Sequence, residues 1–260
     1  MKFFLGTHEV SWLGRTAVPL FISRRRLARQ KTWPRALGPW ALDSGGFTEI
    51  AKYGRWVTEP KQYADELLVW SQAVGAPVFA AIQDWMCEPK MLAKTGLSIR
   101  EHQHRTIQSY LDLKAICPTT IWAPVLQGWK IDEYFNHAEQ YVRAGVNLEQ
   151  CQRVGVGSVC RRQDTYEIWE LFAQLAPLRL KLHGFGLKTK FIDRAFSNAV
   201  TSFDSMAWSS AARHRGKPLD GCTHKTCANC MRYAIQWRDA LVSVGKKPRQ
   251  DILYLTGVAS

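Results

Sequence analysis

Eight short runs of apolar and β-branched residues recur along this 260-residue chain, and amphipathic segments separate the later ones. The runs span residues 2–6, 18–23, 40–43, 78–83, 120–127, 154–159, 178–183 and 199–204. Helical patterns lie between them at 60–74, 98–117, 131–144 and 164–176. Regular alternation of strands and helices predicts a parallel sheet. Eight strands in a chain of this length fit a closed α/β fold, the (β/α)8 TIM-like barrel of roughly 250 residues, better than an open sheet.

The chain is expected to form one domain over residues 1–260, because it contains no internal repeat, low-complexity segment or Gly/Ser linker. A basic, cysteine-containing appendage follows from about Gly216. Two predicted helices begin with capping boxes, Ser98 with Glu101 and Asp164 with Glu167. No apolar stretch approaches the roughly 20 residues that cross a bilayer, and the first residues do not build a signal peptide. We therefore expect a cytoplasmic protein with no membrane partner.

The charge balance points to a polyanionic partner. The chain has 35 Lys and Arg against 22 Asp and Glu, a formal net charge of +13. Much of the excess lies in two clusters, one after the second predicted strand and one after the last. Either cluster alone is typical of a solvated face, but two clusters together with the overall excess favour phosphate contacts. The candidate nucleic-acid-binding residues are Arg24, Arg25, Arg26, Arg213, Arg215 and Lys217.

Polar residues close four of the predicted strands. Asp43, Asp84, Gln127 and Asp204 each stand at or just after the end of an apolar run. In a barrel of this kind the active site lies at the carboxyl ends of the strands, so these side chains are expected to share one pocket. Singly, each is better explained as a helix cap or turn residue. Together, the two carboxylates Asp43 and Asp204 suggest acid/base or nucleophilic chemistry at an acetal-like carbon.

The segments around these residues resemble those of a known enzyme superfamily, in the same order along the chain. They are Asp43-Ser44-Gly45-Gly46-Phe47, Asp84-Trp85-Met86-Cys87-Glu88-Pro89, Val125-Leu126-Gln127-Gly128, Ser202-Phe203-Asp204-Ser205 and Ala212-Arg213-His214-Arg215-Gly216. This pattern is similar to the tRNA-guanine transglycosylase superfamily, (β/α)8 barrels that replace a guanine base through a covalent enzyme intermediate. It is closest to the DpdA-like branch, which modifies DNA with deazapurines. The resemblance covers roughly residues 40–235.

The resemblance implies a role for each motif. Asp204 would be the nucleophile that attacks the sugar C1′, and Asp43 would act as acid/base catalyst. Asp84 and Gln127 would read the base edge, with Gly128, Phe47 and Gly155 beside the base. One segment departs from the pattern: the superfamily's glutamate after the Gly155 segment is missing, and Arg161 and Arg162 stand nearby. This departure suggests a target base other than a deazaguanine.

A Cys/His cluster follows the last motif. Cys222, His224, Cys227 and Cys230 lie within nine residues, and the spacing of the last two is common in zinc knuckles. The sequence predicts a structural Zn²⁺ site within a subregion at about 216–245, because four protein ligands leave no open position for catalysis. A patch of free cysteines is the alternative. Among the other histidines, His8 and His183 are weak pocket candidates, and His102 and His104 are expected at the surface.

Several functions fit these observations. The altered segment after Gly155 narrowly favours a DNA glycosylase that excises a modified base, as an antiphage defence would require. The alternatives are a DpdA-like enzyme that exchanges a DNA guanine for a 7-deazaguanine, and a transglycosylase that acts on tRNA, with RNA as partner. A zinc-stabilised nucleic-acid-binding protein without catalysis belongs to another class, and the paired carboxylates argue against it. The target base, strand state, sequence preference and oligomeric state stay open.

Overall fold

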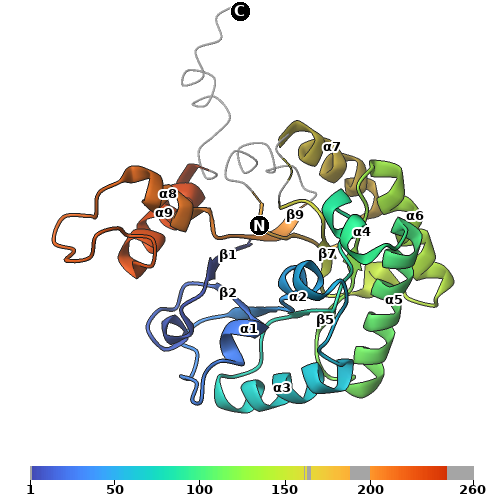
Figure 1. Ribbon diagram of the computed structural model, residues 1–260, viewed down its shortest axis with the longest axis horizontal. Helices are drawn as coiled ribbons and strands as arrows, with labels where there is room; N and C mark the ends of the chain where they lie inside the picture. The colour runs from blue at the N-terminus through green and yellow to red at the C-terminus, as the bar shows by residue number, and fades with distance from the viewer. Residues whose placement is uncertain (1, 161, 163–164, 188–199, 245–260) are drawn as a thin grey trace, which may run out of the picture.

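The structure is a computed structural model that describes residues 2–160, 162, 165–187 and 200–244. Within them, the strands form one parallel sheet in the order β5-β4-β3-β2-β1-β9-β8-β7-β6 (Figure 1). The strands are β1 (Lys2–Thr7), β2 (Leu20–Ser23), β3 (Trp40–Asp43), β4 (Ala80–Ala81), β5 (Trp122–Ala123), β6 (Val125–Leu126), β7 (Val154–Val156), β8 (Leu182–Gly184) and β9 (Val200–Ser205).

A proline divides one of the eight expected strands. Pro124 separates β5 from β6 and has no N–H to donate to a neighbouring strand. Its carbonyl still accepts a hydrogen bond from the Gly155 N–H at 2.7 Å. β5 pairs with β4 and β6 pairs with β7, so the two ends of the strand order are consecutive in the chain. The sheet therefore curls into a (β/α)8 barrel, and all eight predicted runs hold a strand.

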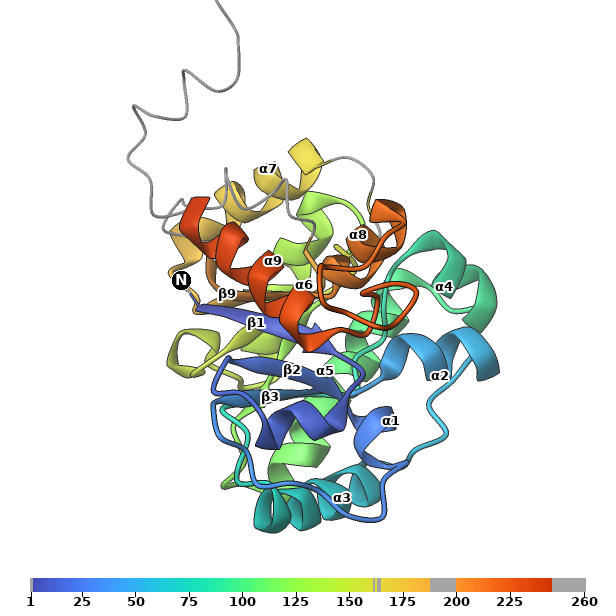
Figure 2. The same ribbon diagram turned by 90° about the vertical axis from the view of Figure 1, so that its left-hand side faces the viewer.

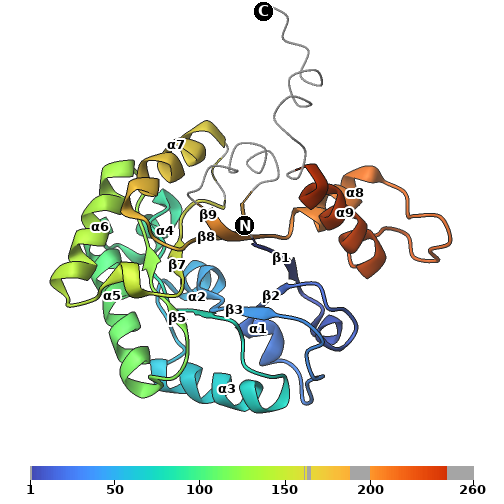
Figure 3. The ribbon, with the colours of Figure 1, turned by 180° about the vertical axis from the view of Figure 1, so that it is seen from behind.

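Helices cover the outside of the sheet (Figures 1 and 3). The early connections carry only η1 (Val10–Gly14) and α1 (Arg24–Leu27), as the sequence suggested for the first forty residues. The later ones carry α2 (Gly46–Tyr53), α3 (Pro60–Ala73), α4 (Pro89–Thr95), α5 (Ile99–Ile116), α6 (Ile131–Arg143), η2 (Leu148–Gln150), α7 (Thr165–Leu175) and η3 (Ala176–Leu178). The Ser98 capping box is confirmed, whereas Asp164 lies outside the described residues.

Side chains alternate between the barrel interior and the layer under the helices. On β1, Phe4 points inward and packs with Phe21 and Phe79, whereas Phe3 and Leu5 belong to the outer core. This is the period of two expected of a strand that is buried on both faces. The interior is therefore packed with aromatic side chains, and a cavity opens above them at the carboxyl ends of the strands.

The C-terminal segment packs onto the barrel. It comprises α8 (Ala207–Arg215), the cysteine-containing loop and α9 (Met231–Val244), which runs alongside β1 in Figure 2. Trp237 of α9 contacts Phe3 with ring centroids 6.2 Å apart, and the Trp208 indole donates a hydrogen bond to the Gly6 carbonyl at 2.8 Å. The appendage is thus tied to β1 by the buried Trp208 and the partly buried Trp237. No described helix combines the length and apolar character needed to cross a membrane.

Candidate active site

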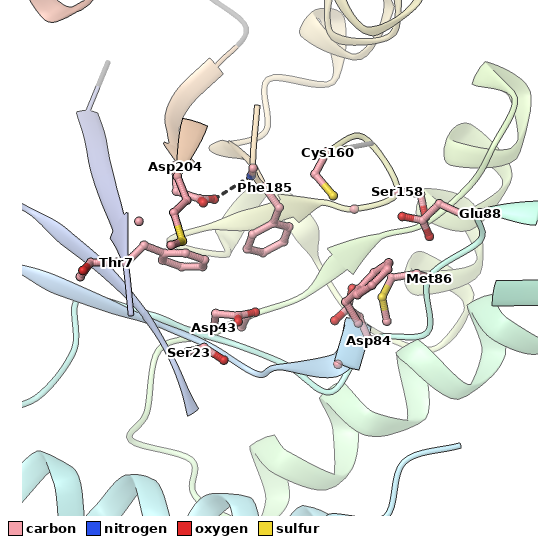
Figure 4. A pocket seen from close by; sticks show the side chains of 18 of the residues that line it. Thr7, Ser23, Asp43, Asp84, Met86, Glu88, Ser158, Cys160, Phe185 and Asp204 are labelled. Carbon is pink, nitrogen blue, oxygen red and sulfur yellow. Dashed lines mark hydrogen bonds between the residues drawn. The ribbon is translucent and has the colours of Figure 1, made fainter. Parts of the chain in front are cut away.

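A cavity of about 230 Å³ opens at the carboxyl ends of the strands (Figure 4). Pockets for drug-sized ligands run to about 300–1,000 Å³, so this one suits a single planar base. Its walls carry four carboxylates, Asp43, Asp84, Glu88 and Asp204, and no Lys or Arg is among the described lining residues. The rest of the lining is Gly6, Thr7, His8, Phe21, Ser23, Gly46, Phe47, Ala81, Met86, Gly157, Ser158, Cys160, Phe185, Gly186 and Met206.

Asp204 lies near the end of β9 and is 6% exposed. Its Oδ1 accepts two hydrogen bonds, from the Gly186 N–H at 2.9 Å and from His183 Nε2 at 3.3 Å. Its backbone carbonyl also accepts a bond from the Leu187 N–H at 3.0 Å. β8 and the segment after it therefore hold both the carboxylate and the backbone of Asp204, and its side chain reaches the cavity in Figure 4.

Asp43 ends β3 and faces the same cavity (Figure 4). Burial raises its pKa above the ordinary value of 3.8, and the negative charge of Asp204 acts in the same direction. Hydrogen bonds from the Gly45 backbone and the Ser23 side chain oppose this rise. Gly45 has a φ of +81°, a conformation that only glycine adopts easily, so the turn after β3 can bring its N–H back to the carboxylate. Asp43 is therefore an acid that holds its proton to higher pH than an exposed aspartate.

Asp84, Gln127 and Ser158 form one hydrogen-bonded chain across the wall of the cavity. The Gln127 Nε2 donates to Asp84 Oδ2 at 2.5 Å, and Ser158 Oγ donates to Gln127 Oε1 at 2.6 Å. Gln127 is fully buried and lies behind the lining rather than in it, so as placed it orients the two residues that reach the cavity. Burial, and then the charge of Asp43, raises the pKa of Asp84 to about 7.

Glu88 brings a further carboxylate into the cavity, and no sequence pattern marks this residue as part of a site. Its Oε2 lies 3.1 Å from Ser158 Oγ, and that hydroxyl also accepts the Cys87 N–H at 2.8 Å. The segment after β4 that carries Glu88 is also held by a hydrogen bond between His102 Nδ1 and the Met86 carbonyl, at 2.7 Å. His102 is fully buried, so its expected place at the surface is wrong: it faces the loop after β4 and not solvent.

The remaining predicted base-contacting residues fall into two groups. Phe47 lines the cavity, whereas Gly155 and Gly128 do not. A Cβ on Gly155 would clash with the Phe185 ring, and one on Gly128 would lie 2.9 Å from the Tyr134 ring, so both glycines allow close packing behind the site. Gly157, which was not predicted, lines the cavity and leaves room for the Gln127 amide.

The predicted phosphate-binding residues differ in exposure, and one of them is buried. Arg24 is 7% exposed and pairs with Glu49 at 3.0 Å and Glu66 at 2.6 Å, so its prediction as a DNA contact is wrong: two acids from α2 and α3 neutralise it in the interior. Arg213, Arg215 and Lys217 are exposed, and Arg25 and Arg26 are partly exposed.

The two basic clusters meet at the mouth of the cavity. Burial lowers the pKa of His8, a lining residue, and the positive charges of Arg26 and Arg213 lower it further. The Arg25 side chain lies against Gly45, where a Cβ would approach its Cγ to 2.9 Å. Of the two arginines after Gly155, Arg162 turns away onto the Trp129 ring at 4.3 Å, and Arg161 lies outside the described residues. The mouth of the cavity is thus cationic and its walls are acidic.

The Cys/His cluster forms a compact ligand set. The Sγ and imidazole nitrogen atoms of Cys222, His224, Cys227 and Cys230 all lie within 4.8 Å of one another. The Cys222 and Cys230 sulfurs are 4.0 Å apart, close to the roughly 3.8 Å edge of a tetrahedron with ~2.3 Å metal–sulfur bonds. The Leu219 N–H donates to the Cys227 sulfur at 3.3 Å, as an amide does to a thiolate ligand. These residues fit a tetrahedral metal ion.

Comparison with known protein families identifies the family to which this barrel is related. The family described as "DpdA: DeoxyPurine in DNA protein A" matches residues 1–260. The chain belongs to the DpdA family. The match confirms the resemblance seen in the sequence motifs and extends it to both ends of the DpdA-like chain. No curated protein sequence is similar enough to count as a match.

The fold itself is widespread. Among solved structures, a putative fructose-1,6-biphosphate aldolase from Coccidioides immitis has a TM-score of 0.54 at 8% identity, with 94% of this chain and 90% of that chain covered. At this identity the similarity concerns the barrel alone. The aldolase likeness therefore carries no information about the site residues of this DpdA-family protein.

Proposed function

We propose that this DpdA-family protein breaks the N-glycosidic bond of a purine in DNA and exchanges that purine for a 7-deazaguanine. The observation that carries the proposal is the presence of Asp204 and Asp43 in one base-sized cavity. Asp204 is held by two donors and Asp43 has a raised pKa, so a nucleophile and an acid face the same bound molecule. The DpdA match favours exchange over the excision that the sequence narrowly suggested.

The chemistry follows from these two carboxylates. A lone pair of Asp204 forms a bond to C1′ while the C1′–N9 bond breaks and its electron pair leaves with the base. Asp43 gives its proton to the departing base. The incoming base then loses a proton to Asp43 and attacks C1′, which regenerates the Asp204 carboxylate. If water attacks instead, the product is an abasic site.

The acidic walls favour one kind of base edge. Asp84 and Glu88 present hydrogen-bond acceptors when ionised, and the edge of guanine or a 7-deazaguanine that carries N1–H and the 2-amino group presents donors. Glu88 supplies a carboxylate that the segment after Gly155 lacks, so the missing glutamate there is no argument against a deazaguanine. Phe47 and Phe185 line the cavity and can stack on the base.

DNA is the proposed polymer because the cationic mouth lies directly above this cavity. A target nucleotide must leave the stack to enter it, and the phosphates on either side then pass the rim. Arg25, Arg26 and Arg213 supply positive charge there from two distant parts of the chain. The Cys/His cluster follows α8, the helix that carries Arg213, and we propose that it holds a structural Zn²⁺ that stabilises this surface.

Incubation with labelled 7-deazaguanine bases tests the function. Wild-type protein should incorporate label into a DNA duplex or single strand and release guanine, whereas Asp204→Asn should do neither and still bind DNA. Asp65→Asn, an exposed carboxylate on α3, is the matched control and should retain activity. Base release that leaves abasic sites without incorporation would support excision. Incorporation into tRNA but not DNA would overturn the assignment of the polymer.

A further inference from the structure

A fully buried histidine lies directly beneath the proposed nucleophile. His183 is the middle residue of β8 and is 0% exposed. Its ring is enclosed by Phe4, Phe21, Phe79 and Phe185, with ring centroids 4.8–6.0 Å away. A polar ring packed among four aromatic rings is costly unless both of its nitrogens are hydrogen-bonded. The partners of those nitrogens therefore show what the histidine is for.

Both nitrogens are bonded to residues of β9. Nδ1 lies 2.8 Å from Ser202 Oγ, and Nε2 lies 3.3 Å from Asp204 Oδ1. An ionised carboxylate only accepts, so Nε2 must carry the proton. Burial lowers the pKa of His183, so the ring is neutral and Nδ1 accepts from the Ser202 hydroxyl. Asp204 thus fixes the tautomer in which Nε2 carries the proton, and the Ser202 hydroxyl satisfies Nδ1 by donating to it.

The two donors to Asp204 converge on the same oxygen. Oδ1 receives the Gly186 N–H and the His183 Nε2–H, and among the residues that the structure describes no donor is bonded to Oδ2. Oδ1 is therefore engaged from the protein side. Oδ2 is the oxygen available to form the bond to C1′, and Oδ1 becomes the carbonyl oxygen of the resulting ester.

We propose that His183 is a positioning residue for Asp204: its Nε2–H holds Oδ1, selects Oδ2 as the attacking atom and favours discharge of the covalent intermediate. The inference rests on the proposed role of Asp204 as nucleophile. When Oδ2 bonds to C1′, the C1′–N9 bond breaks and its electron pair leaves with the base. Hydrogen bonds to a charged acceptor are stronger than those to a neutral carbonyl. The donors on Oδ1 therefore favour the free carboxylate over the ester and help Asp204 to leave.

Removal of this donor should shift the balance toward the ester. His183→Leu keeps the pocket apolar and deletes the donor, so discharge of the intermediate should slow by about tenfold or more relative to its formation. His183→Gln can place an amide N–H near the position of Nε2 and should recover most of the wild-type ratio. Phe79→Leu alters the aromatic box but leaves the donor in place, so it should change stability without changing the ratio.

The experiment measures the two steps separately in the full chain. Protein is mixed with a DNA oligonucleotide, the covalent complex is counted on a denaturing gel, and free 7-deazaguanine is then added to discharge it. Accumulation of the complex in His183→Leu, with recovery in His183→Gln, is the expected result. An unchanged ratio in His183→Leu overturns the role of His183 alone, and so does the same shift in Phe79→Leu.

A second variant and an observation on the wild-type protein complete the test. If His183→Leu does not fold, Ser202→Ala serves instead: without the hydroxyl, Nδ1 loses its partner and the ring loses one of its two anchors. The Nε2–H bond to Asp204 should then weaken, so discharge should slow in the same direction, and a wild-type ratio refutes the proposal. Absence of any covalent complex in the wild-type protein, on DNA and on RNA, would overturn the nucleophile itself and the role of His183 with it.

Discussion

The carboxyl group of Asp84 is expected to cost the protein stability at neutral pH. The fold raises its pKa from 3.8 to about 7, first by burial and then through the negative charge of Asp43. Between these two values the unfolded chain has released the proton that the folded protein still holds, so the free energy of unfolding falls as the pH rises through this window. The full cost is present above about pH 7 and corresponds to about 4 kcal/mol as an upper limit.

Asp84→Asn removes this cost and should stabilise the protein in a pH-dependent way. Urea unfolding should show little gain near pH 4 and a gain of about 2–4 kcal/mol near pH 8. The variant should at the same time lose base exchange, because the acceptor in the cavity wall is altered. Asp65→Asn is the control: Asp65 is exposed and forms a surface ion pair with Lys61, so its loss should change stability by less than about 1 kcal/mol at either pH. An equal gain at both pH values in Asp84→Asn would refute the argument.

Three further outcomes follow from the site. Gly157→Ala should lower base exchange and cost about 1–3 kcal/mol, since a Cβ there clashes with the amide behind the cavity; unchanged activity and melting temperature would contradict this. Cys227→Ser should reduce bound zinc below half an equivalent and lower the melting temperature together with DNA affinity, as metal analysis and thermal unfolding would show. Arg26→Ala and Arg213→Ala should each reduce the slope of log affinity against log salt by about 1, whereas Arg143→Ala on the far helix α6 should not.

The location of the site was predictable because it depends on a simple geometric rule. Once eight strands are read as a parallel barrel, the carboxyl ends of all strands meet at one face, so Asp43, Asp84 and Asp204 have to lie together. The same rule predicts nothing about residues beyond the strand ends. Glu88 and Ser158 enter the cavity through the conformation of loops, and no periodic pattern marks them.

The two wrong predictions, for Arg24 and for His102, share one cause. Arg24 belongs to a run of arginines that looks solvated in one dimension, yet its partners Glu49 and Glu66 come from 25 and 42 residues further along the chain. The spacing of His102 and His104 within one helix predicts that both face solvent, but it carries no information about the loop after β4, which buries His102. In both cases a polar group is buried because a distant segment satisfies it.

The sequence by itself determined the barrel architecture and supplied the residues proposed as reacting groups. Strand and helix periods are local properties of the chain, and the motif residues carry their chemistry in their side chains. Only the tertiary structure decided which of those groups touch the cavity. It placed Gln127 behind the wall, brought Arg26 and Arg213 to one rim, and put His183 beneath Asp204. Each of these depends on the packing of segments far apart in sequence, and burial and hydrogen-bond partners are set by that packing alone.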